Sequence, residues 1–210
     1  MAELVALALR EAIVVYARRS LTDGLVVMAQ GNFSARDPDT GYIAITPHEQ
    51  PYAGMTPNSL VIVDVDGKKV AGEHSPSFET PVHCTVYRER PAVMAVAHTE
   101  PPYINAFGAL GRAIPPITST TYKAAGGTIA IMPYRRSGSV EFAQEMLAVM
   151  GDSYGVVWAN HGMMVVGPNI DLAYERSLAI ETGARVYHLA LQLGEPQTLA
   201  WIKDRGSIVA

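Results

Sequence analysis

The sequence predicts a single-domain α/β protein in which a mixed, largely antiparallel sheet is covered by helices. The chain has 210 residues, 49% of them hydrophobic, which is enough for one substantial core. The predicted strands occur in hairpins and short runs between predicted helices, and this order favours antiparallel pairing over a doubly wound parallel sheet. The chain contains no internal repeat and no linker rich in Gly, Ser or Pro, so residues 1–210 are expected to form one domain.

The first half of the chain predicts a helix, two hairpins and a second helix. Apolar positions at helical spacing predict an amphipathic helix over residues 3–19. Gly-containing turns at 37–41 and at Asp66-Gly67 each join two strands. These strands are expected at residues 33–36, 42–46, 60–65 and 68–70. The second helix is predicted over residues 77–89, and Pro91 ends it.

The second half predicts three further strands and three helices. The strands are expected at residues 93–97, 156–159 and 163–166. The helices are expected at residues 103–110, 140–150 and 171–193. Ser139 is a natural N-cap for the second of these helices, and Gly194 is a natural stop for the third. Residues 114–130 mix prolines, a Thr/Ser cluster and a Gly pair, and they predict no single element.

Composition argues against several classes of function. The formal net charge is −4 without a basic stripe, and this argues against nucleic acid as a main partner, because neutralising phosphates requires clustered Lys and Arg. The longest apolar stretches are far shorter than the ~20 residues that span a bilayer, so no membrane partner is expected. Residues 1–4 lack a basic leader region, and the single cysteine, Cys84, leaves no internal disulfide. We therefore expect a cytoplasmic protein with Cys84 in its core rather than at a reactive site.

Side chains able to bind a metal ion stand at the ends of apolar runs. His98 and Glu100 follow the apolar run 93–97, and side chains at i and i+2 of a strand point to the same face, so both are able to reach one ion. His161 follows a second apolar run, and Glu79 opens a predicted helix. Two imidazoles and two carboxylates are sufficient for a divalent-metal site with room for a substrate.

Each of these patterns also has an explanation without a metal ion. A His-x-Glu pair is often solvated or hydrogen-bonded, a His before Gly can mark a turn, and a helix dipole favours any acidic residue in its first turn. The coincidence of three segments at the ends of apolar runs, where loops gather, favours a site. The sequence contains no dinucleotide-binding or phosphate-loop glycine motif and no Gly-x-Ser-x-Gly elbow.

Taken in order, six short motifs resemble the class II aldolase/adducin family, which includes fuculose-phosphate aldolase. The resemblance covers roughly residues 4–194. The motifs are Gly31-Asn32-Phe33-Ser34, Ile45-Thr46-Pro47, Ser77-Phe78-Glu79, the strand that ends in His98, Ala125-Gly126-Gly127 and Asn160-His161-Gly162. The resemblance implies a three-layer αβα fold around a mixed, largely antiparallel sheet.

The resemblance also implies one divalent metal ion per subunit. In the family, a His-x-His pair and the His before Gly hold the ion, and the carboxylate after a Ser pair is a further ligand or the catalytic base. Carried over, His98 and His161 are ligands, and Glu79 is the acid/base and a further ligand. Glu100 stands where the family has the second His of His-x-His. As a ligand it makes the set harder, so that Mn, Fe or Co compete with Zn; the alternative is that Glu100 does not coordinate.

The family's substrate-binding positions are retained only in part. By resemblance, the substrate-binding residues here are Gly31, Asn32, Thr46 and Ser77. The family's Thr-Gly is replaced by His48-Glu49 and its second Ser by Phe78, which removes a hydrogen-bond donor and adds an acidic group beside a phosphate. A substrate without a phosphate group, such as a hydroxy-ketone or hydroxy-acid, is therefore an alternative. Tyr122 lies close to the stretch that carries the family's catalytic tyrosine.

The implied function is that of a metal-dependent aldehyde-lyase, which cleaves a short ketose or ketose 1-phosphate through an enediolate. Alternatives are a decarboxylase or 4-epimerase that uses the same metal site, or a non-catalytic adducin-like scaffold. Retention of Glu79, His98 and His161 argues against the scaffold. The resemblance further implies a small carbohydrate substrate and a homotetramer with active sites at the subunit interfaces, where Tyr122 serves the neighbouring subunit.

Overall fold

One sheet runs through the computed structural model, which describes residues 4–199. Within these residues its eight strands follow the order β4-β3-β2-β1-β5-β8-β7-β6. The strands are β1 (Asn32–Arg36), β2 (Ile43–Ile45), β3 (Val61–Val63), β4 (Lys69–Ala71), β5 (Ala95–Thr99), β6 (Ile131–Met132), β7 (Gly155–Trp158) and β8 (Gly162–Gly167). Neighbouring strands pair antiparallel except β6 with β7, which are parallel. The predicted mixed, largely antiparallel sheet is confirmed.

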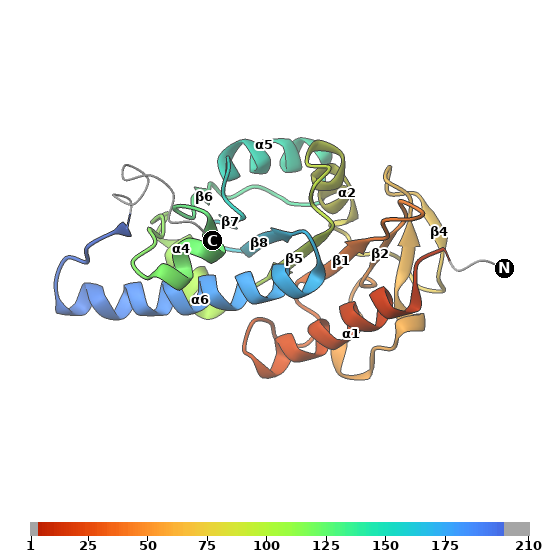
Figure 1. Ribbon diagram of the computed structural model, residues 1–210, viewed down its shortest axis with the longest axis horizontal. Coiled ribbons are helices and arrows are strands. Elements are labelled where there is room, and N and C mark those ends of the chain that lie inside the picture. Colours follow the sequence, from red (N-terminus) through yellow and green to blue (C-terminus); the bar gives the residue numbers. More distant parts are fainter. Residues whose placement is uncertain (1–3, 200–210) are drawn as a thin grey trace.

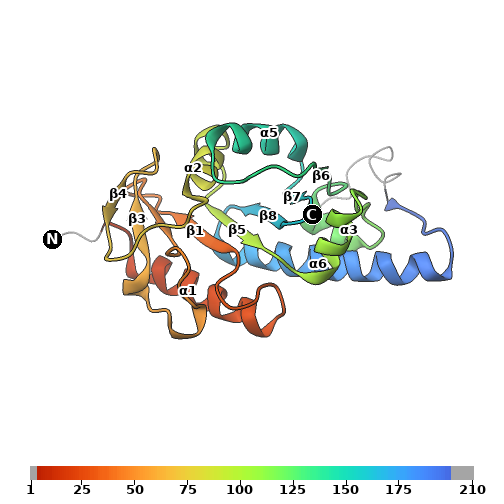
Figure 2. The same cartoon turned by 180° about the vertical axis from the view of Figure 1, so that it is seen from behind.

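Helices cover both faces of this sheet and complete a three-layer αβα fold (Figures 1 and 2). The helices are α1 (Leu7–Thr22), α2 (Thr80–Glu89), α3 (Pro102–Ala109), α4 (Ser119–Ala125), α5 (Val140–Met150) and α6 (Ile170–Leu193). Helices α2 and α5 lie on one face, α1 and α6 on the other, and α3 and α4 pack against α6. Short 3₁₀ turns at Tyr52–Gly54 and Pro57–Ser59 connect β2 to β3. In the described part of the chain, no helix combines the length and apolarity needed to cross a bilayer.

Strand alternation directs successive side chains to the two cores. In β5, Val96 is buried in the core beneath α2 and α5, whereas Ala97 is buried in the core against α1. Because side chains two residues apart share a face of the sheet, His98 lies on the same face as Val96. Across the β1–β5 ladder, Asn32 pairs with His98 and Ser34 with Val96. The α2/α5 face therefore carries polar side chains at one end of its two central strands.

The structure shifts several predicted boundaries. The first helix runs from Leu7 to Thr22 rather than over 3–19. Helix α2 begins at Thr80, three residues later than predicted, because the Ser77 carbonyl accepts hydrogen bonds from the Thr80 N–H and hydroxyl in a preceding turn. Residues 114–130, which predict no element, contain α4, whose end at Gly126 has a φ of +72°. Cys84 is buried within α2, as expected.

Candidate active site

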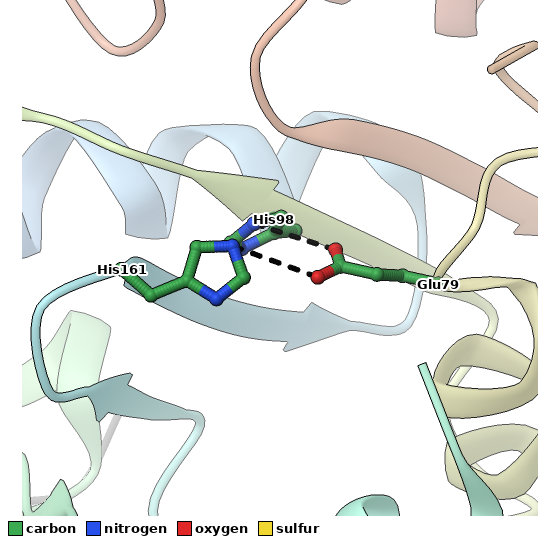
Figure 3. Close-up of side chains that lie close together, drawn as sticks. All are labelled: Glu79, His98 and His161. Carbon is green, nitrogen blue, oxygen red and sulfur yellow. Dashed lines mark ion pairs between the residues drawn. The ribbon is translucent and has the colours of Figure 1, made fainter. Parts of the chain in front are cut away.

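Glu79, His98 and His161 converge from three separate elements (Figure 3). Glu79 directly precedes α2, His98 lies in β5, and His161 lies between β7 and β8. Their potential ligand atoms all lie within 4.8 Å of one another. Glu79 Oε2 is 3.4 Å from His98 Nε2, and Glu79 Oε1 is 3.6 Å from His161 Nε2. The structure thus brings together three of the four predicted metal ligands.

The imidazole of His98 is oriented for metal binding. Its Nδ1 lies 2.9 Å from the Met163 carbonyl oxygen and therefore donates a proton there, because a carbonyl only accepts. Neutral His98 then presents the unprotonated Nε2, with its lone pair, toward Glu79. Fixing the tautomer through the second ring nitrogen is the usual arrangement of a metal-binding histidine. The chemistry of this donor set fits a divalent ion.

Glu100 faces the same point from the end of β5. Its Oε1 is 3.9 Å from His98 Nε2 and 4.0 Å from His161 Nε2. Burial raises the pKa of Glu100, although the positive field of His161 and a hydrogen bond from the Gly31 backbone oppose the rise. The predicted sharing of one face by residues 98 and 100 is present, with Glu100 just outside the tight Glu79–His98–His161 cluster.

The two glycines beside these histidines allow the backbones to approach closely. A Cβ on Gly162 would lie 2.5 Å from the Thr99 carbonyl oxygen and 3.0 Å from His98 Cε1. Gly31 has a φ of +69°, and a Cβ added to it would clash with the carbonyl oxygen of His98. The Gly that follows His161 is therefore explained by the backbone of β5, which leaves no room for a side chain at position 162.

We predict that Gly162→Ala destabilises the protein by about 1–3 kcal/mol, as overpacking of a tight site does, and weakens metal binding by displacing the His98 ring. Thermal unfolding and metal titration would measure the two effects. Gly54→Ala is the matched control, because a Cβ there meets no atom within 4 Å. Equal stability of the two variants would contradict the close-approach explanation.

The Glu79 carboxylate is held on both oxygens. Asn32 Nδ2 donates to Oε2 at 2.8 Å, and the Ser137 hydroxyl donates to Oε1 at 2.6 Å. Burial raises the pKa of Glu79, but the two imidazoles and these two hydrogen bonds outweigh burial and leave the pKa below its ordinary value. Glu79 is therefore a carboxylate at neutral pH.

The site opens into a cleft of about 370 Å³. Three predicted substrate-binding residues, Gly31, Asn32 and Ser77, line it together with the metal-ligand candidates. The other lining residues are Ala29, Gln30, Pro47, His48, Glu49, Phe78 and Ser137. His48, Glu49 and Phe78, which depart from the family pattern, thus face the same space as the cluster, and the Glu49 backbone has a left-handed φ of +52°.

Two predicted residues lie away from this cleft. Thr46 is fully buried, and its hydroxyl accepts a hydrogen bond from the Phe33 N–H, so within the chain it holds β1 to the end of β2. Tyr122 lies in α4, which packs against α6, and does not line the cleft of its own chain. The roles predicted for both remain predictions.

Sequence reasoning missed Ser137, Trp158 and His83. Trp158 stacks on His98 with ring centroids 4.4 Å apart and meets His161 edge-on. His83 hydrogen-bonds to Asn32 behind the site. A signal for His83 was present, because it follows Glu79 by four residues in a predicted helix and so shares its face.

Comparison with known proteins assigns this architecture to one family. Residues 11–188 match the family model described as the class II aldolase and adducin N-terminal domain. The chain is 33% identical over 190 residues to a 5-deoxy-D-ribulose 1-phosphate aldolase of Bacillus thuringiensis serovar kurstaki, covering 90% of this chain and 89% of the relative. It is 34% identical over 193 residues to a 5-methylthioribulose-1-phosphate/5-deoxyribulose-1-phosphate aldolase of Rhodospirillum rubrum, covering 92% of this chain and 86% of the relative. A solved L-fuculose 1-phosphate aldolase superposes with a TM-score of 0.88 at 25% identity, covering 94% and 93% of the two chains.

Proposed function

Because the chain belongs to the class II aldolase and adducin family, we propose that it is a divalent-metal-dependent aldolase that cleaves a short ketose or ketose 1-phosphate. The observation that carries this proposal is the convergence of Glu79, His98 and His161 in an open cleft, with the His98 tautomer set for metal binding. The two aldolases from Bacillus thuringiensis and Rhodospirillum rubrum, at 33% and 34% identity, both carry ketose 1-phosphates in their names, which supports this substrate class.

The metal-ligand proposal uses residues already at the cleft. His98, His161 and Glu79 would hold one divalent ion, with Glu100 as a fourth ligand. When bound, the ion would act as a Lewis acid for the negative charge that develops on the substrate oxygens. Two imidazoles and two carboxylates form a harder set than three imidazoles, so Mn, Fe and Co are candidates beside Zn.

The proton balance of the cleavage assigns a role to Glu79. Breaking the C3–C4 bond leaves its electron pair on C3, while the C4 hydroxyl loses a proton and becomes an aldehyde. C3 then gains a proton, and we propose that Glu79 delivers it, or removes it in the condensation direction. Its position against both imidazoles, at 3.4 and 3.6 Å, supports this role.

We propose that Tyr122 acts at the C4 oxygen of a neighbouring subunit's substrate in a homotetramer. Its position outside its own chain's cleft is compatible with action across an interface. Light scattering coupled to gel filtration tests the assembly directly. A monomer at micromolar concentration that retains full activity would overturn this part of the proposal.

The experiment that tests the function is product analysis with the metal-loaded protein. A 5-deoxyketose 1-phosphate and its dephosphorylated counterpart are supplied separately, and aldehyde release is followed by a coupled NADH assay. We expect aldehyde and a three-carbon ketone product in equal amounts. Epimer formation without aldehyde would instead assign the chain to the 4-epimerase reaction. CO₂ release in a separate assay supplied with a keto-acid would assign it to the decarboxylase reaction.

We predict that Glu100→His restores the family's ligand set and shifts metal preference toward zinc, because a third imidazole replaces a hard carboxylate. Competition of Zn²⁺ with Mn²⁺ for the purified protein, read by plasma mass spectrometry, measures the shift. Glu49→His, at the exposed edge of the same cleft, is the control for adding an imidazole nearby. Unchanged selectivity in Glu100→His would show that Glu100 is not a ligand.

A further inference from the structure

Behind the cleft, a line of buried polar side chains leads away from Glu79. Asn32 donates to Glu79 through Nδ2, and its Oδ1 lies 2.6 Å from His83 Nε2. His83 Nδ1 lies 2.7 Å from the Ser34 hydroxyl, which lies 2.6 Å from the Tyr87 hydroxyl. His83, Ser34 and Tyr87 are at most 1% exposed.

The periodicities of two elements build this line. Asn32 and Ser34 are two residues apart in β1 and therefore share the face toward α2. Glu79, His83 and Tyr87 are four residues apart along α2 and its N-terminal flank, so they form one stripe toward β1. The strand and the helix thus place their polar groups alternately against each other.

The direction of every hydrogen bond in the line follows from its end at Glu79. A carboxylate only accepts, so Asn32 must turn its NH₂ group toward Glu79 and its oxygen toward His83. That oxygen requires a proton on His83 Nε2. Burial lowers the pKa of His83 to about 3, so the ring is neutral at physiological pH and Nδ1 carries no proton.

The far end of the line accommodates this tautomer. With Nδ1 unprotonated, the Ser34 hydroxyl donates to it, and the Tyr87 hydroxyl donates to Ser34. The opposite direction would turn the amide oxygen of Asn32 toward Glu79 Oε2, 2.8 Å from the amide atom that faces it, and two acceptors would oppose each other. All donors therefore point toward the cleft.

We propose that His83 is a positioning residue, which locks the Asn32 amide with its NH₂ group on Glu79 and thereby fixes that carboxylate in front of His98 and His161. His83 itself touches neither the cleft nor the ligand cluster. The effect on turnover rests on the proposed function, whereas the tautomer and the effect on metal affinity do not.

Solid-state ¹⁵N NMR of the zinc-loaded protein labelled with ¹⁵N-histidine tests the tautomer. Subtracting the spectrum of His83→Gln isolates the His83 signals from those of the other histidines. We expect a protonated Nε2 and an unprotonated Nδ1. A protonated Nδ1 would overturn the proposal, because Asn32 would then face Glu79 with its oxygen.

A pair of carboxamide variants tests the positioning. His83→Gln places an NH₂ group near the original Nε2, whereas His83→Asn reaches only the original Nδ1. Relative to the Gln variant, we expect the Asn variant to lose about 10–100-fold in Zn²⁺ affinity and in kcat, the range for outer-shell partners of metal ligands, with KM unchanged. Equal losses in both variants would show that His83 contributes only to packing.

Two further variants, each lacking one buried hydroxyl, separate the effect on the His83 tautomer from a general loss of stability. Tyr87→Phe removes a buried hydroxyl but leaves the Ser34–His83–Asn32 contacts, so zinc affinity and kcat should stay at the wild-type level. Ser34→Ala removes the donor to Nδ1 and is expected to give a mixture of His83 tautomers with weaker zinc binding. Weakening in Tyr87→Phe equal to that in Ser34→Ala would overturn the proposal. If wild-type protein lacks aldolase activity, the proposed function fails, while the tautomer and zinc affinities still decide the role of His83.

Discussion

Replacing Glu79 by glutamine is expected to lower kcat by about 10²–10⁴-fold, the range for loss of a general acid/base, while the protein still binds its metal ion. Glutamine keeps the size and polarity of the side chain. Its oxygen can accept from Asn32, and its NH₂ group can donate to Ser137, whose hydroxyl turns to accept. The variant therefore keeps the local packing and an oxygen at this position, and it loses the carboxylate proposed to move a proton at C3.

Steady-state kinetics together with metal content per subunit by plasma mass spectrometry measures this effect. Ser137→Ala is the matched control, because it removes the other hydrogen bond to Glu79 and leaves the carboxylate in place. We expect the control to lose far less activity than Glu79→Gln. Wild-type turnover in the metal-loaded Glu79→Gln protein would remove Glu79 from the role of acid/base.

Replacing His98 by alanine is expected to weaken metal binding by more than about 100-fold, beyond the loss typical of outer-shell partners, and to abolish measurable turnover. His98 is 1% exposed, is held through Nδ1 by the Met163 carbonyl oxygen, and stacks on Trp158. Alanine removes the proposed ligand and the hydrogen bond from Nδ1 to the Met163 carbonyl, so some loss of stability accompanies the loss of metal.

Titration with Co²⁺ and Zn²⁺ measures the affinity, and thermal unfolding reports the accompanying loss of stability. His188→Ala removes an exposed imidazole on α6, where His188 contacts Gln192, and should leave metal binding unchanged. A His98→Ala protein that binds one ion with wild-type affinity would show that the ion lies elsewhere.

The parts of the fold that depend on local pattern could be predicted from the sequence. Apolar runs and Gly-containing turns identified seven of the eight strands in the described residues, and β6, only two residues long, was missed. The candidate site residues could also be identified from local pattern. His98, Glu100 and His161 follow apolar runs, and Glu79 stands at the start of a helix. Their convergence was an expectation from strand geometry and resemblance, and the structure places Glu79, His98 and His161 together.

Other parts depend on contacts that no local pattern reveals. The start of α2 is set by the Ser77 carbonyl, and the Ser137 hydroxyl reaches Glu79 across 58 positions of sequence. Its spacing places His83 on the same helix face as Glu79, but its hydrogen bond depends on Asn32, which faces it from β1. The role proposed for Tyr122 involves a neighbouring subunit, which a single chain does not contain.

The order of strands at the centre of the sheet couples ligand binding to folding. Strands β1, β5 and β8 are neighbours in space but come from distant parts of the chain, and the Glu79–His98–His161 cluster exists only when β5, β8 and the start of α2 are in place. An ion that binds this cluster therefore binds the folded chain and not its separated segments. By mass action it stabilises the folded chain by about 2.7 kcal/mol at a hundred times its dissociation constant. Chelation should then lower the unfolding temperature of the whole domain, rather than loosen one loop.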